Sequence, residues 1–293
     1  MPLAIILETT TLCVIGSAAF IGNVSLFIIV YKDKDLQTVT NLYILNLAAA
    51  DIMVSILSIP FTVVTIITED WVFGDSACVA LGFFTILSFI ASVMSLGMIA
   101  INRYFYIVRW NTYSKIFSRR KALLYAAAVW VVALSLASPP LLGWAEYRFI
   151  PGKSYCFVYW PSDVYYMYFM INVCFFGPLS IMTFSYCNVL RFTKNLKRRI
   201  AATRNNFVRP VPTIPNKVDL QTVERSQTGE RREADSNSKS TSRSPGFQVT
   251  PEETRITNTF IFVVTLFIIC WAPFAITMFF DVYYPKPLPR ALD

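Results

Sequence analysis

Six long runs of apolar residues follow one another along the chain, separated by shorter polar connections. Each run is near or above the about 20 residues with which a helix crosses about 30 Å of hydrocarbon. The runs are apolar on all helix faces rather than alternating, which favours membrane helices over the strands of a membrane barrel. The predicted spans are residues 5–31, 42–68, 77–108, 123–142, 164–190 and 256–280. The pattern predicts an all-α, polytopic transmembrane helical bundle.

The composition of the chain excludes several classes of protein. The chain of 293 residues is 55% hydrophobic and 15% charged, whereas a soluble domain carries about 25% charged residues. It contains no histidine, so catalytic triads and metal sites that depend on histidine are excluded. An intramembrane enzyme is disfavoured as well, because Asp51 has no second acid at membrane depth. We therefore expect a membrane protein that is not an enzyme.

Basic residues set the predicted orientation. With the N-terminus outside, 22 of the 26 lysines and arginines lie on the inner side, and Arg148, Lys153, Lys286 and Arg290 remain outside. The positive-inside rule therefore places the N-terminus on the extracellular side. The same distribution explains the net charge of +8, so topology accounts for it without a nucleic-acid partner.

The connection between the fifth and sixth runs differs in composition from the rest. It is rich in Arg, Ser, Thr and Asn and nearly lacks aromatic residues, so it is predicted to be disordered. Its serines and threonines could accept phosphate, or it could be an unmodified linker. The expected organisation is spans one to five over residues 1–190, a basic cytoplasmic loop over 191–254, span six over 255–281, and an outer tail or loop over 282–293.

Two of the six cysteines face the outer side. Cys78 stands at the start of the third run and Cys156 lies in the next outer connection, and an oxidising compartment favours a disulfide between them. Such a bond would hold the outer loop over the end of the third span. The other cysteines lie inside runs and are expected to behave as small apolar residues.

One carboxylate lies at membrane depth. Asp51 stands within the second run, where a charge costs about 2.5–3.5 kcal/mol on insertion scales and must face the bundle interior. Asn23 in the first run and Ser92 in the third are its expected partners. Two interpretations remain open: a polar pocket that holds water or a cation, with sodium at Asp51 and Ser92 as one hypothesis, or a protonated Asp51 that joins helices.

The third run carries a directional pattern. Helical spacings align Thr85, Phe89, Ser92 and Arg103 along one face, which suits a helix that links the two ends of a bundle. A simpler explanation of Arg103 alone is a position at the inner membrane surface.

Prolines and aromatic residues mark the sixth run and several others. Phe267, Trp271, Phe274 and Met278 share one face of the sixth run, a pattern typical of packing as well as of ligand contact. Prolines inside the runs are expected to bend their helices, at Pro60, Pro139, Pro140, Pro178 and Pro273.

Taken together, these residues resemble the rhodopsin-like (class A) family of G-protein-coupled receptors over nearly the whole chain apart from the inner loop. The resemblance implies a seven-helix receptor fold of which six spans are present. The motifs that carry it are, in chain order, Gly22-Asn23, Leu45-Asn46-Leu47-Ala48-Ala49-Ala50-Asp51, Trp71, Cys78, Asn102-Arg103-Tyr104, Trp130, Cys156, Pro178 with Tyr186, and Cys270-Trp271-Ala272-Pro273.

Within this family the chain is most similar to melatonin receptors, with some opsin-like features. Asn102 precedes Arg103 as in melatonin receptors, whereas Gly143-Trp144 is more opsin-like. Melatonin receptors carry a histidine in span five that this chain lacks. An opsin binds retinal through a lysine in the seventh span, and the chain ends at Asp293 before such a span. We favour a fragment of a longer receptor over a truncated, nonsignalling one.

The resemblance also implies roles for particular residues. Because Thr85 stands where amine receptors carry an aspartate, a small and mostly neutral ligand is expected, melatonin-like or otherwise. The implied ligand contacts are Thr85, Phe89, Phe157, Met170, Cys174, Trp271, Phe274 and Met278. The implied residues of G-protein coupling and of the activating switch are Asn102, Arg103, Tyr104, Tyr186, Glu253, Phe267 and Pro273.

The expected setting is the plasma membrane, with a heterotrimeric G protein, the ligand, membrane lipids, arrestin and receptor kinases as partners. No cofactor is expected apart from the sodium hypothesis, or retinal if the protein is an opsin. A transporter or channel is the alternative from another class, and it is disfavoured because the two halves of the chain show no inverted repeat.

Overall fold

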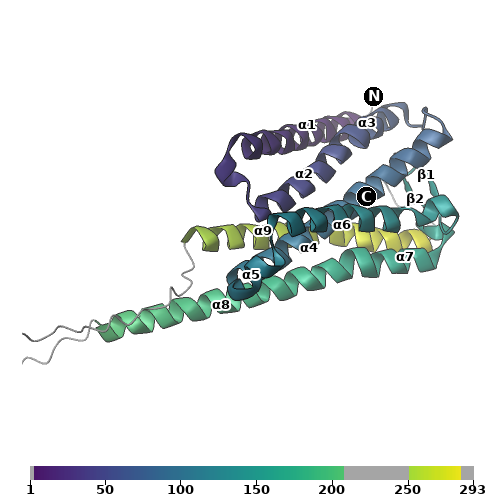
Figure 1. The fold of residues 1–293 in the computed structure, drawn as a ribbon. Coiled ribbons are helices and arrows are strands. Elements are labelled where there is room, and N and C mark those ends of the chain that lie inside the picture. The colour runs from purple at the N-terminus through teal and green to yellow at the C-terminus, as the bar shows by residue number, and fades with distance from the viewer. Residues whose placement is uncertain (1–2, 208–250, 285–293) are drawn as a thin grey trace, which may run out of the picture.

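The computed structural model describes residues 3–207 and 251–284, which form a bundle of long helices (Figure 1). The first part contains α1 (Leu3–Lys32), η1 (Lys34–Leu36), α2 (Val39–Leu57), α3 (Ile59–Thr68), α4 (Asp75–Ile107), α5 (Trp110–Ile116) and α6 (Arg119–Ala137). The second part contains η2 (Pro139–Leu142), β1 (Tyr147–Ile150), β2 (Tyr155–Val158), η3 (Trp160–Ser162), α7 (Val164–Met170), η4 (Ile171–Phe176), α8 (Gly177–Phe207) and α9 (Pro251–Tyr283). The elements marked η are short 3-10 turns, except η4, which is a π-helix.

The predicted membrane bundle is confirmed. Five helices long and apolar enough to cross a membrane occur among the described residues, and each coincides with a predicted span: Leu3–Lys32, Val39–Thr68, Asp75–Ile107, Arg119–Ala137 and Val164–Arg199. The sixth predicted span lies within α9.

α4 is the central element of the bundle. It packs against α2, α6, α8 and the β1–β2 hairpin, and it passes between α1–α3 on one side and α8 with α9 on the other (Figure 1). Buried side chains recur along it from Cys78 to Ile107. A helix that is apolar on all faces is stable where neighbours cover every face, so the third run becomes the axis of the molecule.

A shared hydrogen-bond network joins α4 to two neighbours. Trp130 Nε1 of α6 donates to Asn46 Oδ1 of α2 at 2.7 Å, and Asn46 Nδ2 donates to Ser95 Oγ of α4 at 2.9 Å. Hydrogen bonds between polar side chains hold membrane helices together where apolar contact alone gives no preference over lipid. The network therefore sets how α2, α4 and α6 face one another.

Proline interrupts the second span as predicted. Pro60 has no N–H group to bond the carbonyl of Ile56, and the helix breaks at Ser58 between α2 and α3. Thr62 N bonds Ser58 O at 3.0 Å where the helix resumes. The break lies where Ser58 and Ile59 border the main cavity.

Proline also changes the fifth span. Pro178 cannot donate to the carbonyl of Cys174, and the preceding turn is the π-helix η4, in which Gly177 N bonds Asn172 O. This wider turn lies between α7 and α8. Ile171 and Cys174 of the turn are buried in the bundle.

Two tyrosines satisfy carbonyl groups that the paired prolines leave free at the end of α6. Pro140 supplies no backbone N–H for the carbonyl of Leu136, and Leu141 N bonds Ser138 O at 2.9 Å instead of the carbonyl of Ala137. Tyr166 OH donates to Leu136 O at 2.9 Å, and Tyr147 OH donates to Ala137 O at 2.7 Å. The end of α6 is thereby attached to α7 and to the hairpin.

The β1–β2 hairpin covers the outer end of α4. The strands are antiparallel, with Phe149 opposite Cys156, and the predicted disulfide joins Cys78 to Cys156 with the Cα atoms 5.3 Å apart. Tyr147 of β1 lies over Gly82 of α4 so closely that a Cβ atom on Gly82 would come within 2.8 Å of the ring. The disulfide and this contact fix the hairpin over the bundle.

The domain boundaries need one correction. Disorder was expected from residue 191, but α8 remains helical to Phe207, and α9 begins at Pro251, before the expected start at 255. The physical reason is that Lys, Arg, Leu and Ala, which dominate residues 194–202, are good helix formers. Residues 208–250 and the tail from 285 lie outside the described residues.

Candidate functional site

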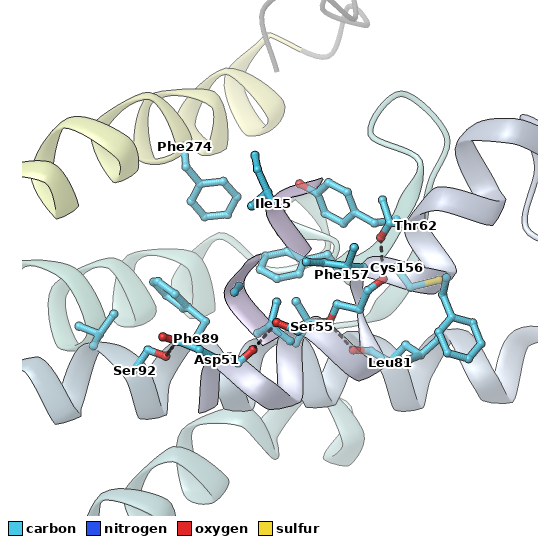
Figure 2. Close-up of a pocket in the computed structure, with 18 of the residues that line it drawn as sticks. Ile15, Asp51, Ser55, Thr62, Leu81, Phe89, Ser92, Cys156, Phe157 and Phe274 are labelled. Atoms are coloured by element: carbon cyan, nitrogen blue, oxygen red, sulfur yellow. Dashed lines mark hydrogen bonds between the residues drawn. The ribbon is translucent and has the colours of Figure 1, made fainter. Parts of the chain in front are cut away.

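A cavity of about 710 Å³ opens inside the bundle at the end that carries the disulfide (Figure 2). α1, α2, α3, α4, β2 and α9 all contribute to its wall. Pockets for small organic molecules usually measure about 300–1,000 Å³ and are mainly apolar with a few polar groups. The cavity has the size and the lining of such a pocket.

All eight predicted ligand contacts line one of two neighbouring cavities. Thr85, Phe89, Phe157, Trp271 and Phe274 line the large one. Met170, Cys174 and Met278 line a second cavity of about 30 Å³, which shares Phe89, Trp271 and Phe274 with the first. The structure therefore brings the predicted residues together around two adjoining cavities.

The predicted ligand contacts belong to spans three, five and six and to the outer loop, whereas the large cavity also extends to α1, α2 and α3. Ile15, Asp51, Ser55, Ser58 and Thr62 line this extension. A pattern in the sequence could have indicated it, because the four polar residues recur at helical spacing in an otherwise apolar run.

Hydroxyl groups and one carboxylate form the polar side of the cavity. Ser58 Oγ and Thr85 Oγ1 share a hydrogen bond of 2.7 Å that joins the α2–α3 break to α4. Ser55 Oγ donates to the backbone carbonyl of Asp51 at 2.8 Å. Among the described residues that line the cavity, Asp51 is the only charged one. The outer part of the cavity therefore offers hydrogen bonds without a charge.

Of the two expected hydrogen-bond partners of Asp51, the structure shows one in contact with it and the other bonded elsewhere. Ser92 Oγ donates to Asp51 Oδ1 at 3.1 Å, as expected. Asn23 does not take this role, because its Nδ2 donates to Ala19 O of its own helix at 2.8 Å. A carboxylate and a hydroxyl are the oxygen ligands that hard cations prefer, so Asp51 and Ser92 fit a sodium ion as its protein ligands.

Aromatic rings from three elements close the cavity on the side opposite Asp51. The ring centroids of Phe157 in β2 and Phe274 in α9 lie 5.8 Å apart, and those of Phe274 and Trp271 lie 5.4 Å apart. The ring centroids of Trp271 and of Phe89 in α4 lie 4.2 Å apart. In Figure 2, Phe274 enters the cavity from one side while Asp51 and Ser92 lie at the other. An occupant would therefore touch α4, the hairpin and α9 together.

A buried cluster continues from these rings toward the other end of α4. Val93, Leu96, Ala100, Met182 and Tyr186 form it, with Phe89 and Trp271 packed against its near end. Tyr186 at its far end interacts electrostatically with Arg103, which is 8% exposed. Continuous packing thus connects the cavity with Tyr186, which lies close to the predicted switch residue Arg103.

Asn102 lies at the junction of three helices. Thr40 Oγ1 of α2 donates to Asn102 Oδ1 at 2.8 Å, and Asn102 Nδ2 donates to Tyr113 OH of α5 at 3.2 Å. Asn102 is fully buried. Next to it, Tyr104 OH accepts a hydrogen bond from Arg109 Nε at 3.4 Å. This network holds the short helix α5 against the end of the bundle.

The remaining predicted switch residues belong to α9. Pro273 lies inside this helix, where it cannot donate to the carbonyl four residues earlier. The backbones of Glu253 and Phe267 also belong to α9, but their side chains lie outside the described residues.

Comparison with known proteins gives a consistent result. The family model "7 transmembrane receptor (rhodopsin family)" matches residues 22–292. The alpha-1D adrenergic receptor of Homo sapiens is 28% identical over 93% of this chain and 48% of its own length. G-protein coupled receptor 161 of Danio rerio is 28% identical over 67% of this chain and 37% of its own length. Melatonin receptor type 1B of Mus musculus is 29% identical over 69% of this chain and 55% of its own length.

A solved structure supports the fold. The crystal structure of squid rhodopsin superposes with a TM-score of 0.71 over 97% of this chain and 74% of that chain, at 22% identity. This similarity concerns the fold alone. The chain spans about half the length of the curated relatives that it matches.

Proposed function

Because the chain belongs to the rhodopsin family of seven-transmembrane receptors, we propose that it binds a small, mostly neutral molecule in the large cavity and transmits this event to a heterotrimeric G protein. The observation that carries the proposal is the packed path from the cavity to Tyr186, which lies close to Arg103. The rings of Phe89 and Trp271 line the cavity and also pack on the cluster that ends at Tyr186. Members of this family are receptors rather than enzymes.

The proposed setting is the plasma membrane with the N-terminus outside. Two features support the same orientation. The disulfide lies at the end reached by β1 and β2, and disulfides persist in oxidising compartments. Lysines and arginines gather at the opposite end, as cytoplasmic flanks do.

The lining favours a neutral ligand over a cationic amine. The Ser58–Thr85 pair and the rings of Phe157 and Phe274 offer hydrogen bonds and apolar contact, while the carboxylate of Asp51 is engaged by Ser92. Cationic ligands in apolar pockets need an anion to offset their desolvation. Melatonin is therefore a more suitable first probe than an adrenergic agonist, although relatives named for both are similar to this chain.

The proposed switch repacks the cluster below the cavity. A ligand that contacts Trp271 would favour one position of α9, with Pro273 as the pivot and Val93 and Pro178 among the residues that adjust. Such a shift would change access to Arg103. The ligand acts only through its different affinity for the two positions of the helix.

The proposal is tested by measuring G-protein activation in cells that express the protein, with melatonin and with an adrenergic agonist as probes. We expect activation by melatonin at lower concentration, and a loss of at least tenfold in potency for Phe89→Ala, whose ring lines both cavities. Phe84→Ala is the matched control, because Phe84 is exposed on the same helix and lies outside both cavities. Equal effects of the two substitutions would contradict the assigned cavity.

The arginine switch has its own test. If Glu253 restrains Arg103 in the resting receptor, Glu253→Ala raises G-protein activation in the absence of ligand. An unchanged basal signal at equal surface expression would remove Glu253 from the mechanism.

We also propose that Asp51 and Ser92 hold a sodium ion, which would neutralise the carboxylate at membrane depth. Sodium chloride should then raise the midpoint of thermal unfolding relative to potassium chloride, and Asp51→Asn should abolish this difference. Asp35→Asn serves as the control, because Asp35 is exposed and remote from the cavity. If both salts stabilise the unsubstituted protein equally, a protonated Asp51 that joins α2 to α4 is the better interpretation.

A further inference from the structure

A third cavity of about 420 Å³ lies at the end of the bundle opposite the disulfide. The last turns of α1, the start of α2 and the start of α6 surround it, and it shares no lining residue with the main cavity. Neither the ligand site nor the switch accounts for a hollow at this place.

Most of its wall is apolar and open toward the membrane. Phe27 of α1, Leu42 and Leu45 of α2, and Leu123 of α6 line it. Phe27 and Leu123 are 36% and 52% exposed on the outer surface of the bundle. Because this surface faces hydrocarbon in the bilayer, an acyl chain can reach the cavity sideways without crossing water.

Among the described residues, one cationic side chain lines this cavity. Arg119 is the first residue of α6, and its Nη2 donates to Gln37 Oε1 at 3.4 Å, which directs the guanidinium to the cavity. Among the described residues no carboxylate lies within 4 Å of it. The first turn of α6 contains no acid, and the positive end of a helix favours a bound anion.

The neighbouring basic residues do not share this position. Lys121 Nζ donates to the backbone carbonyl of Lys115 at 2.6 Å and is thereby directed to α5. Arg120, which is exposed as Arg119 is, does not line the cavity. Of the three basic residues at the start of α6, Arg119 is therefore the one that lines the cavity.

From these features we propose that the third cavity binds an anionic phospholipid, with its phosphate at Arg119 and Gln37 and one acyl chain among α1, α2 and α6. The guanidinium offers paired donors that match phosphate geometry, and the apolar wall matches the chain. A sterol would bring one uncharged hydroxyl to this cation. The inner leaflet follows from the orientation proposed above, whereas the lipid class depends only on the cavity.

The test uses the purified protein in nanodiscs of phosphatidylcholine with increasing fractions of phosphatidylserine, and bound lipid is counted by native mass spectrometry. One arginine near a membrane surface contributes enough to change anionic lipid binding about fivefold. We expect Arg119→Gln to lower retention of phosphatidylserine about three- to tenfold and leave phosphatidylcholine unchanged. Arg120→Gln, the adjacent charge outside the cavity, should have a clearly smaller effect, because Arg120 contributes only diffuse attraction and no paired hydrogen bonds to one phosphate.

A second pair of variants tests the acyl chain. Leu123→Trp fills the cavity and should lower phosphatidylserine retention, whereas Leu124→Trp places the same ring on a neighbouring exposed position outside it. Thermal unfolding and gel filtration identify any variant that fails to fold. Equal losses for Arg119→Gln and Arg120→Gln would show diffuse attraction and overturn the proposal. Displacement of phosphatidylserine by a sterol but not by phosphatidylglycerol would overturn it in favour of a sterol site.

Discussion

At the scale of single residues, buried polar side chains define this molecule more than apolar ones. Asn46, Asn102 and Asp51 each lie where hydrocarbon or protein replaces water, and each has a hydrogen-bond partner on another helix. A buried polar group without a partner costs about 1–3 kcal/mol. These three residues therefore decide which helices can be neighbours.

Substitution of Asn102 tests this view. Asn102→Ala should lower the free energy of unfolding by about 1–3 kcal/mol, because the hydroxyl groups of Thr40 and Tyr113 lose their shared partner. Thermal unfolding in detergent would measure the change. Asn111→Ala, at an exposed position of α5, should change stability by less than about 0.5 kcal/mol. A loss of similar size at both positions would mean that the network does not stabilise the bundle.

At the scale of elements, interruptions of regular helix place the site. Pro60 breaks the second span next to Ser58, and Pro178 follows the π-turn that contains Cys174. Both breaks lie beside the cavities. A helix that lacks some of its regular hydrogen bonds can direct side chains into a space that the side chains of a regular helix would not reach.

The contact between α4 and the hairpin gives a prediction at this scale. Gly82→Ala would place a Cβ atom 2.8 Å from the ring of Tyr147, whose hydroxyl is bound to Ala137 O and cannot easily withdraw. We expect a loss of about 1–3 kcal/mol in the free energy of unfolding from this overpacking.

Gly97→Ala is the matched control on the same helix. Apart from its own stretch of helix, no atom lies within 4 Å of the Cβ position at Gly97. Alanine there should therefore be neutral or stabilise by up to about 1 kcal/mol through helix propensity. Should Gly82→Ala behave like Gly97→Ala, the hairpin is not held against α4 by close packing.

At the scale of the whole molecule, contacts between distant segments close the bundle around the cavity. Lys153 Nζ, in the turn of the hairpin, lies 2.9 Å from Asp281 Oδ2 in α9, and both side chains are largely buried. The hydroxyl groups of Tyr168 in α7 and Tyr283 in α9 share a hydrogen bond of 2.7 Å. Together they attach the outer end of α9 to the elements that precede α8.

Breaking the ion pair should loosen this closure. Asp281→Asn is expected to destabilise the protein by about 3–5 kcal/mol, because Lys153 is left buried without its counter-charge. The exchange of Lys153→Glu with Asp281→Lys should recover part of the loss. Glu146→Gln, at an exposed position near the hairpin, is the control for a general change of charge. A double exchange no more stable than either single charge reversal would show that the pair is not coupled.

The sequence by itself determined the number and position of the spans, the disulfide and the need of Asp51 for a partner. These follow from physical limits that act along one dimension: the thickness of the membrane, the redox state of its outer side and the cost of a charge in hydrocarbon. The helical extension of α8 to Phe207 also lay within reach of helix propensity, although composition suggested disorder there.

Only the tertiary structure decided which side chains meet. A run that is apolar on all faces reveals its length but not its rotation or tilt, which packing against neighbouring helices sets. Sequence therefore could not choose between Asn23 and Ser92 as the partner of Asp51. The spacing of Asp51, Ser55 and Ser58 marks a polar helix face, but the sequence does not show whether a cavity lies beside it. That cavity and the hollow beside Arg119 depend on how three or more helices lie against one another.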